Sequence, residues 1–110
     1  MKLVIIADDK RVCVDGLCFD DLDTSQLDSS IHAVQWGGEY GEVEFKSKFE
    51  NGQITKAQNQ IITDVTPYQW AVDAWNVAKA AYDLAIAEAE AAAEAQAAQN
   101  QPVVAGTDTL

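Results

Sequence analysis

The feature that most constrains this chain of 110 residues is a long segment beginning at Thr66, in which nothing after the first turn interrupts a helix until Pro102. Alanine, glutamate, leucine, lysine and glutamine dominate the segment, and all of them favour helical backbone. At 1.5 Å per residue, roughly 33 helical residues would span about 50 Å. We therefore predict one long, alanine-rich helix over residues 66–100, and we expect residues 101–110 to form a flexible tail.

The predicted start of this helix carries several signals at once. Thr66-Pro67-Tyr68-Gln69 fits a capping box, with Thr66 as the N-cap, Pro67 at the first helical position and Gln69 at the third. Val65 before the cap and Trp70 four residues after it could form a hydrophobic staple. These signals place the boundary between two regions of the chain just before Thr66.

The first 65 residues are different, because short apolar runs alternate with turn-forming residues. Asp15-Gly16 is a strong turn dipeptide, and Asn51-Gly52 marks another turn. Residues 20–30 are rich in aspartate and serine, which predicts a loop with room for one helical turn. Strands are expected over residues 2–7, 11–14, 17–19, 31–36 and 40–46, and around Ile54 and Ile61-Ile62. The predicted fold class is α+β: a small antiparallel β-rich head, residues 1–65, precedes the long helix.

The clearest predicted hairpin joins residues 31–36 to residues 40–46 through a turn at Gly37-Gly38, the glycine turn. In its second strand Val43 and Phe45 alternate with charged residues, as a strand with one wet face requires. Strict alternation in its first strand would place Ile31 and Ala33 on one face, with His32, Val34 and Trp36 on the other.

Apolar residues fall on two opposite sides of the predicted helix at 100° per residue. One stripe holds Tyr68, Val72, Trp75, Tyr82 and Ile86, and the other holds Trp70, Ala74, Val77, Ala81 and Leu84. A helix that only covers a sheet needs one stripe. We assign the first stripe to the core of the head and the second to a partner. The alternative is that the head wraps the first turns of the helix on both sides.

The candidate partner-binding residues are therefore Trp70, Val77 and Leu84, with Trp36 and Tyr40 as a secondary patch beside the glycine turn. Trp36 and Tyr40 could instead pack in the core or hairpin, or stack on a ligand such as a sugar.

Cys13 and Cys18 are the only cysteines, and His32 is the only histidine. In a reducing cytoplasm two small buried thiols are the expected state. A disulfide stays open if both side chains face the same way across Asp15-Gly16. No zinc site is expected, and the aspartates of residues 20–30 lack the spacing of a calcium loop.

The formal net charge of −11 argues against nucleic acid and anionic membranes as partners. The short apolar run near the N-terminus does not fit a signal peptide, and no run is long enough for a membrane span. None of the common catalytic or nucleotide-binding motifs occurs, and His32 has no nucleophile motif near it, so we expect neither enzymatic activity nor a cofactor.

The segment Ile31–Trp36 (IHAVQW), the glycine turn and the strand Gly41–Phe45 resemble a pattern in small proteins encoded near tail-fibre genes of tailed bacteriophages. The helix of that pattern is matched by Tyr68, Val72–Trp75 and the Ala-Lys pair that follows. The resemblance covers roughly residues 28–82. It implies a non-enzymatic role in the virion tail or in its assembly, for a protein made in the host cytoplasm.

Three functions follow as hypotheses. The first is a tail-associated structural protein that binds a tail, baseplate or fibre protein, with self-association through the helix as a further option. The second is a tail-fibre assembly chaperone that is not retained in the virion. The third is an acidic inhibitor that mimics DNA towards a host nucleic-acid-binding protein.

Overall fold

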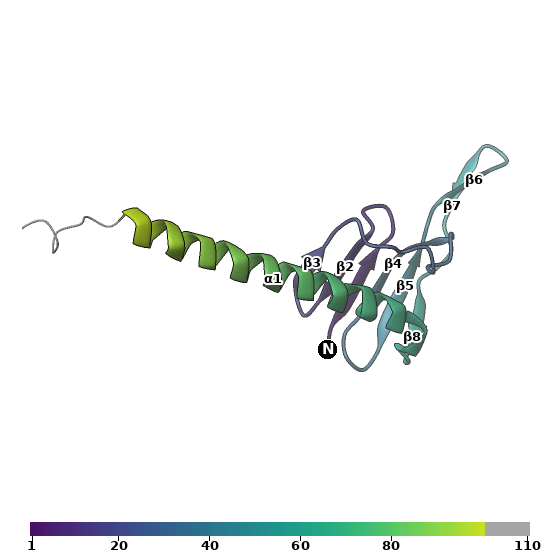
Figure 1. The fold of residues 1–110 in the computed structure, drawn as a ribbon. Coiled ribbons are helices and arrows are strands. Elements are labelled where there is room, and N and C mark those ends of the chain that lie inside the picture. The colour runs from purple at the N-terminus through teal and green to yellow at the C-terminus, as the bar shows by residue number, and fades with distance from the viewer. Residues whose placement is uncertain (101–110) are drawn as a thin grey trace, which may run out of the picture. The chain divides into compact units, whose positions relative to one another are not determined.

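The computed structural model describes residues 1–100, and the predicted tail over residues 101–110 lies outside this range. The chain divides into two compact units, residues 1–78 and a second unit that starts at Lys79. The first unit contains every strand and the first turns of the helix, and the described part of the second unit is helical. An antiparallel sheet followed by one long helix confirms the predicted α+β class (Figure 1).

Eight strands precede the helix; seven lie close to the predicted positions, and the sixth, over residues 48–50, was not predicted. They are β1 (Leu3–Ile6), β2 (Arg11–Val14), β3 (Leu17–Phe19), β4 (Ile31–Trp36), β5 (Gly41–Phe45), β6 (Lys48–Glu50), β7 (Gln53–Thr55) and β8 (Gln60–Ile62). A short 3-10 turn, η1 (Thr66–Tyr68), leads into α1 (Gln69–Asn100). Six strands form one antiparallel sheet in the order β3-β2-β1-β4-β5-β8, while β6 and β7 pair only with each other.

One face of the six-stranded sheet forms the hydrophobic core. The register places Leu3 opposite Val14 and Ile5 opposite both Val12 and Val34, so these side chains share that face. Leu3, Ile5, Val12 and Val34 are completely buried. Each such side chain contributes roughly 1.5–3 kcal/mol by leaving water. Leu22 and Leu27 of the loop over residues 20–30 pack against the same core, and that loop holds turns and no helix.

The strict alternation predicted for β4 is wrong at its start. The register shifts between Ile31 and Ala33, which is a β-bulge, and Ile31 pairs with Phe45. The extra residue, His32, lets Ile31 join Val34 and Trp36 in the core. Because a bulge changes the direction of side chains without changing the residues of the strand, the apolar pattern of β4 did not reveal it.

The predicted capping box is also wrong. Thr66 begins η1, the position before it is Val65, and no side chain caps that end. The Thr66 hydroxyl instead donates to Asp64 Oδ1 at 2.6 Å, and the Thr66 amide donates to the same oxygen at 2.9 Å. These two hydrogen bonds lower the pKa of Asp64. Val65 and Trp70 both pack against the core, as a staple would require.

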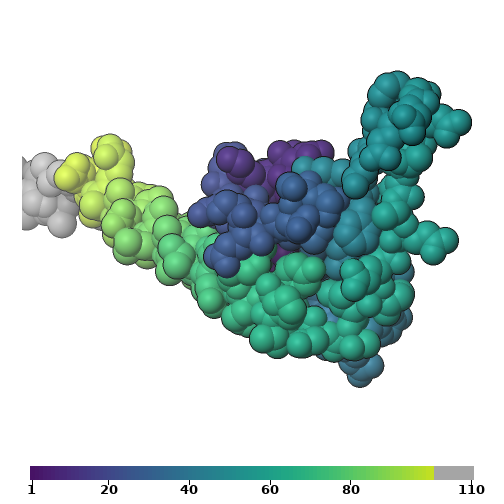
Figure 2. All heavy atoms as spheres, turned by 90° about the vertical axis from the view of Figure 1, so that its right-hand side faces the viewer, coloured from purple at the N-terminus to yellow at the C-terminus, as the bar shows by residue number. Residues whose placement is uncertain are grey.

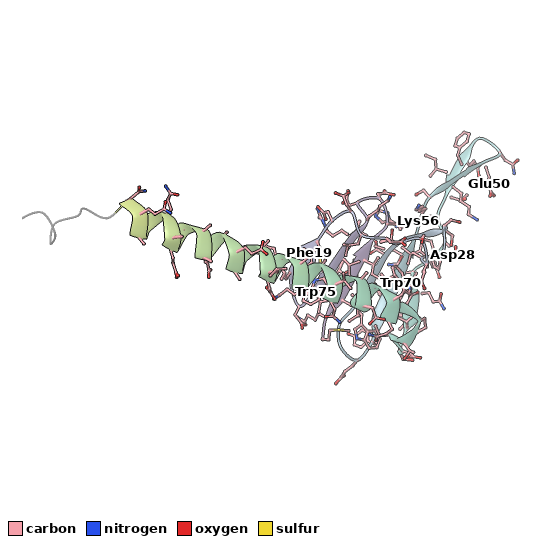
Figure 3. All side chains as sticks on the ribbon, viewed as in Figure 1. Phe19, Asp28, Glu50, Lys56, Trp70 and Trp75 are labelled. Carbon is pink, nitrogen blue, oxygen red and sulfur yellow. A yellow bond between two sulfur atoms is a disulfide. The ribbon has the colours of Figure 1, made fainter. Side chains whose placement is uncertain are left out.

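Trp75 attaches the first part of α1 to the edge strand β3. Its indole Nε1–H donates to the Leu17 carbonyl oxygen at 2.8 Å. Its ring lies 5.9 Å from the Phe19 ring, centroid to centroid, at an interplanar angle of 57° (Figure 3). Tilted pairs at this distance are favourable because a ring edge meets a ring face. The helix therefore contacts β3 through both an apolar pair and a hydrogen bond.

The expected pair of buried thiols is wrong, because Cys13 and Cys18 form a disulfide. They lie directly opposite each other on β2 and β3, joined by the turn at Asp15-Gly16. Cys13 is buried, whereas Cys18 is exposed. Two facing positions on neighbouring antiparallel strands bring their side chains onto the same face, which is the geometry on which the alternative depended.

Candidate contact surfaces

The five candidate partner-binding residues have different surroundings. Val77 is 73% exposed, Leu84 61% and Tyr40 64%. Trp36 is only 7% exposed, and Trp70 is partly buried against the core of the first unit. The three exposed residues have side-chain surface that a partner could contact, while both indoles contribute mainly to packing within the head.

Trp70 packs inward at the start of α1, which the chain reaches from β8 through η1. Val65, Tyr68, Trp70 and Val72 all pack against the core, and Ala71 between them is fully buried. Burial also raises the pKa of Tyr68. Residues at very different angles around the first turn thus share one core. This matches the alternative in which the head wraps the helix start on both sides.

Of the first stripe, Tyr68, Val72 and Trp75 pack against the core as predicted. Tyr82 and Ile86 belong to the second unit, where they are 45% and 38% exposed. The division of the helix into an inner and an outer stripe therefore applies only between Asp73 and Ala78, and the assignment of Tyr82 and Ile86 to the core of the head is wrong.

A cleft of about 720 Å³ lies beside the glycine turn, and Tyr40 and Trp36 are both part of its lining. Gln35 and Glu42, from β4 and β5, line the same cleft and belong to the sheet face opposite the core. Gln35 donates to Glu44 Oε1 on that face at 3.1 Å. Because Trp36 is buried, a ligand could stack on Tyr40 but not between two rings.

The most exposed apolar residues of the head were not among the predicted contact residues. Phe49 on β6 and Ile54 on β7 are 75% and 76% exposed. They lie directly opposite each other in the two-stranded ladder, on either side of the turn at Asn51-Gly52, where both residues have positive φ. We name this element the β6–β7 hairpin; Figure 2 shows it standing clear of the six-stranded sheet.

The sequence held a signal for this surface. Phe49 and Ile54 lie two residues before and two after Asn51-Gly52, and a two-residue turn brings such positions opposite each other on one face. An isolated two-stranded hairpin is marginally stable in water. The two large apolar side chains at its centre have no opposing layer within residues 1–100 and are therefore exposed to water.

The charge of the hairpin is opposite to that of the whole chain. Lys46, Lys48 and Lys56 are three of the seven basic residues of the protein, and Glu50 is the only acidic residue among residues 46–57. The three lysines line a cleft of about 450 Å³ at the base of the hairpin. The hairpin is therefore a cationic and apolar element in a protein of net charge −11.

Ser30 also lines this cleft and is held in a turn by Asp28. Asp28 Oδ1 accepts hydrogen bonds from the Ser30 amide at 2.9 Å and from the Ser30 hydroxyl at 2.6 Å. Both bonds favour the ionised carboxylate and lower the pKa of Asp28. The Ser30 carbonyl in turn accepts from the Lys46 amide at 2.8 Å, which fixes the chain where it enters the hairpin.

The helical second unit has the opposite chemistry. Lys79 donates to both carboxylate oxygens of Asp83, the shorter contact being 2.6 Å. After Lys79 the chain contains no further lysine or arginine, whereas Glu88, Glu90 and Glu94 follow. Leu84 is 61% exposed among these acidic residues. This part of α1 therefore presents aliphatic side chains in an anionic setting.

Within residues 1–100, no three histidine, cysteine, aspartate or glutamate side chains gather closely enough to hold a metal ion. The described part of α1 is too polar to cross a membrane. Comparison of the chain with protein-family models, with curated proteins and with solved structures finds no match. The residues and surfaces described above are consequently the basis of the functional proposal.

Proposed function

We propose that this protein is a bacteriophage tail-associated structural protein that acts through protein–protein contacts. The observation that carries the contact role is the exposure of Phe49 and Ile54 on a hairpin that no element of residues 1–100 covers. The exposed Val77 and Leu84 on α1 supply a second apolar surface. Burying large apolar side chains that are exposed in this way against a partner is favourable because it removes them from water.

The tail assignment rests on the resemblance to proteins encoded near tail-fibre genes. The residues that carry it occupy β4, β5 and the first turns of α1. In this chain they build the core of the head and attach the helix to it, since Val34, Val43 and Val72 all belong to that core or pack against it. The resemblance thus concerns the scaffold, while the β6–β7 hairpin and the acidic part of α1 are the surfaces that we assign to partners.

Quantitative mass spectrometry of purified particles tests the proposal. We expect the protein to be present at a constant ratio to the tail proteins and to remain after a high-salt wash. Presence in infected cells but absence from finished particles would contradict a structural role and support the assembly chaperone.

A matched pair of variants tests whether the hairpin makes the contact. Phe49→Ser combined with Ile54→Ser should reduce the amount retained in particles. Ile61→Ser, at a position on β8 that is 60% exposed, should leave retention unchanged. Equal retention of all three proteins would show that the hairpin is not the attachment surface.

A further inference from the structure

The Cys13–Cys18 disulfide holds β3, the short strand at one edge of the six-stranded sheet. Within residues 1–100, this strand has three residues and pairs with β2 alone. An edge strand with so few ladder hydrogen bonds opens at a lower cost in free energy than the central strands do. Cys18 is the middle residue of β3, so the disulfide fixes the strand at its centre.

The two chain neighbours of Cys18 contact the helix. Successive side chains of a strand point to opposite faces of the sheet. Phe19 lies opposite Val12, which is completely buried in the core, so Phe19 belongs to the core face and Cys18 to the opposite face. Trp75 of α1 contacts the Phe19 ring, and its indole Nε1–H donates to the Leu17 carbonyl oxygen. The disulfide and the helix contacts therefore act on the same three residues.

The disulfide is accessible to a reductant from one side. Cys18 is exposed, whereas Cys13 is only 7% exposed, so a thiolate of the glutathione class attacks the Cys18 sulfur. A mixed disulfide with Cys18 forms, and Cys13 leaves as a thiolate that takes up a proton. A second thiol then attacks the mixed disulfide, which releases Cys18 as a thiol and the reductant as its own disulfide. Two electrons pass in total from the reductant to the two cysteines.

We propose that the Cys13–Cys18 disulfide is a redox switch that controls how firmly α1 is attached to β3. In the oxidised state β3 is fixed, and Trp75 is held by both of its contacts with this strand. In the reduced state β3 separates from β2 more often. Because Trp75 also packs against the core, it stays with the rest of the sheet when β3 moves away, and its hydrogen bond to Leu17 breaks.

The effect of the switch is confined to this edge of the sheet. The buried core cluster of residues 1–100 includes Ala71 at the start of α1 but no residue of β3. The start of the helix therefore stays packed when β3 opens. A reducing compartment loosens the contacts of Trp75 with β3, and oxidising surroundings fix them. This switch is independent of the proposed tail function, because it needs only the chain itself and a thiol.

Hydrogen exchange of the Trp75 indole Nε1–H measures the state of the switch. The full-length protein contains three tryptophans, and Trp75→Phe identifies the Trp75 signal in a heteronuclear NMR spectrum. Reduction with excess dithiol should speed exchange at this position at least about tenfold, because a disulfide that closes even a short loop opposes local opening by such a factor. Mass spectrometry after alkylation verifies that both thiols are free, and re-oxidation should restore slow exchange.

An internal control and a variant separate the switch from other effects of the reagent. The Trp36 indole lies on β4 and is 7% exposed, so its exchange should change by less than about twofold on reduction. Cys13→Ala combined with Cys18→Ala should show fast exchange at Trp75 both with and without the dithiol. Far-UV circular dichroism verifies that the reduced protein and the double variant are folded.

Equal exchange at Trp75 in the oxidised and the fully reduced protein would overturn the switch. Equal acceleration at Trp36 and Trp75 would also overturn it, because that result would report unfolding of the whole head. A disulfide that glutathione reduces only in denaturant would show that Cys18 is closed to attack in the folded protein, and would overturn the switch as well.

Discussion

The attachment of α1 to the sheet through Trp75 gives the sharpest prediction about the fold. Trp75→Phe keeps an aromatic ring but removes the indole N–H that donates to the Leu17 carbonyl oxygen at 2.8 Å. Trp75→Ala also removes the ring that lies 5.9 Å from Phe19. Comparing the two substitutions separates the hydrogen bond from the aromatic contact.

The magnitudes follow from the contacts that are lost. Loss of a neutral hydrogen bond costs about 0.5–1.5 kcal/mol, and the smaller ring buries less apolar surface, so Trp75→Phe should cost about 1–2 kcal/mol. Trp75→Ala should cost about 2–4 kcal/mol, at the lower end for large-to-small substitutions because the ring is only partly buried. In a double-mutant cycle, Phe19→Ala should couple to Trp75→Ala by about 0.5–1.5 kcal/mol.

Urea unfolding followed by far-UV circular dichroism measures these free energies of unfolding. Val77→Ala is the matched control, because Val77 lies two residues further along α1 and is 73% exposed. Its substitution should change stability by less than about 0.5 kcal/mol. If Trp75→Ala were no more destabilising than Val77→Ala, the helix would not be attached to β3 in the way described here.

Three further predictions concern other parts of the head. Reducing the Cys13–Cys18 disulfide should lower the free energy of unfolding by about 2 kcal/mol, because the closed loop is short; urea titration with and without a dithiol checks this, and an unchanged midpoint would contradict it. Gly41→Ala should destabilise by about 2–4 kcal/mol, because the added Cβ would meet the Gln35 carbonyl oxygen and lie 2.8 Å from a backbone Cα of β4; thermal unfolding should show this loss. The pKa of Asp64 is lowered in the folded state, so its contribution to stability is present above about pH 4 and lost as the pH falls through the folded value. The free energy of unfolding of the wild type and of Asp64→Asn should be measured from pH 7 to pH 2. The two values should differ at pH 7 and become equal in acid. A difference that stays constant with pH would refute the contribution assigned to Asp64.

Much of the fold was predictable because its signals are local. The apolar run before Asp8 predicts β1, Asp15-Gly16 predicts the hairpin of β2 and β3, and Asn51-Gly52 predicts a turn, since each needs only neighbouring residues to form. The long helix was predictable for the same reason. Composition alone separates residues 1–65 from the segment after Thr66.

The wrong predictions depend on competition or on register. The hydroxyl of Thr66 donates to Asp64 rather than capping the helix. The bulge at His32 and the facing positions of Cys13 and Cys18 depend on how strands pair. Trp70 packs inward against the core at the start of α1, a long-range arrangement that a helical wheel does not contain.

The exposed apolar surfaces of residues 1–100 were predicted only in part. Val77, Leu84 and Tyr40 are exposed, as partner-binding residues need to be, but the β6–β7 hairpin was missed. The helical wheel showed ten apolar positions on the predicted helix, whereas the sequence signal for the hairpin consists of only two apolar residues around one turn. The pair Phe49 and Ile54 could be recognised as an exposed surface only from the structure, in which nothing in the head covers Phe49.

Site-specific photo-crosslinking tests the central claim, that this protein works by contact through its exposed hairpin. A photoreactive benzoyl-phenylalanine would replace Phe49, and in a control protein Lys10, in the cells or particles where the protein is naturally made. We predict that position 49 crosslinks to another polypeptide, whether a second copy or a particle protein, and that position 10 does not. Crosslinking that is absent at position 49, or equal at the two positions, would contradict it.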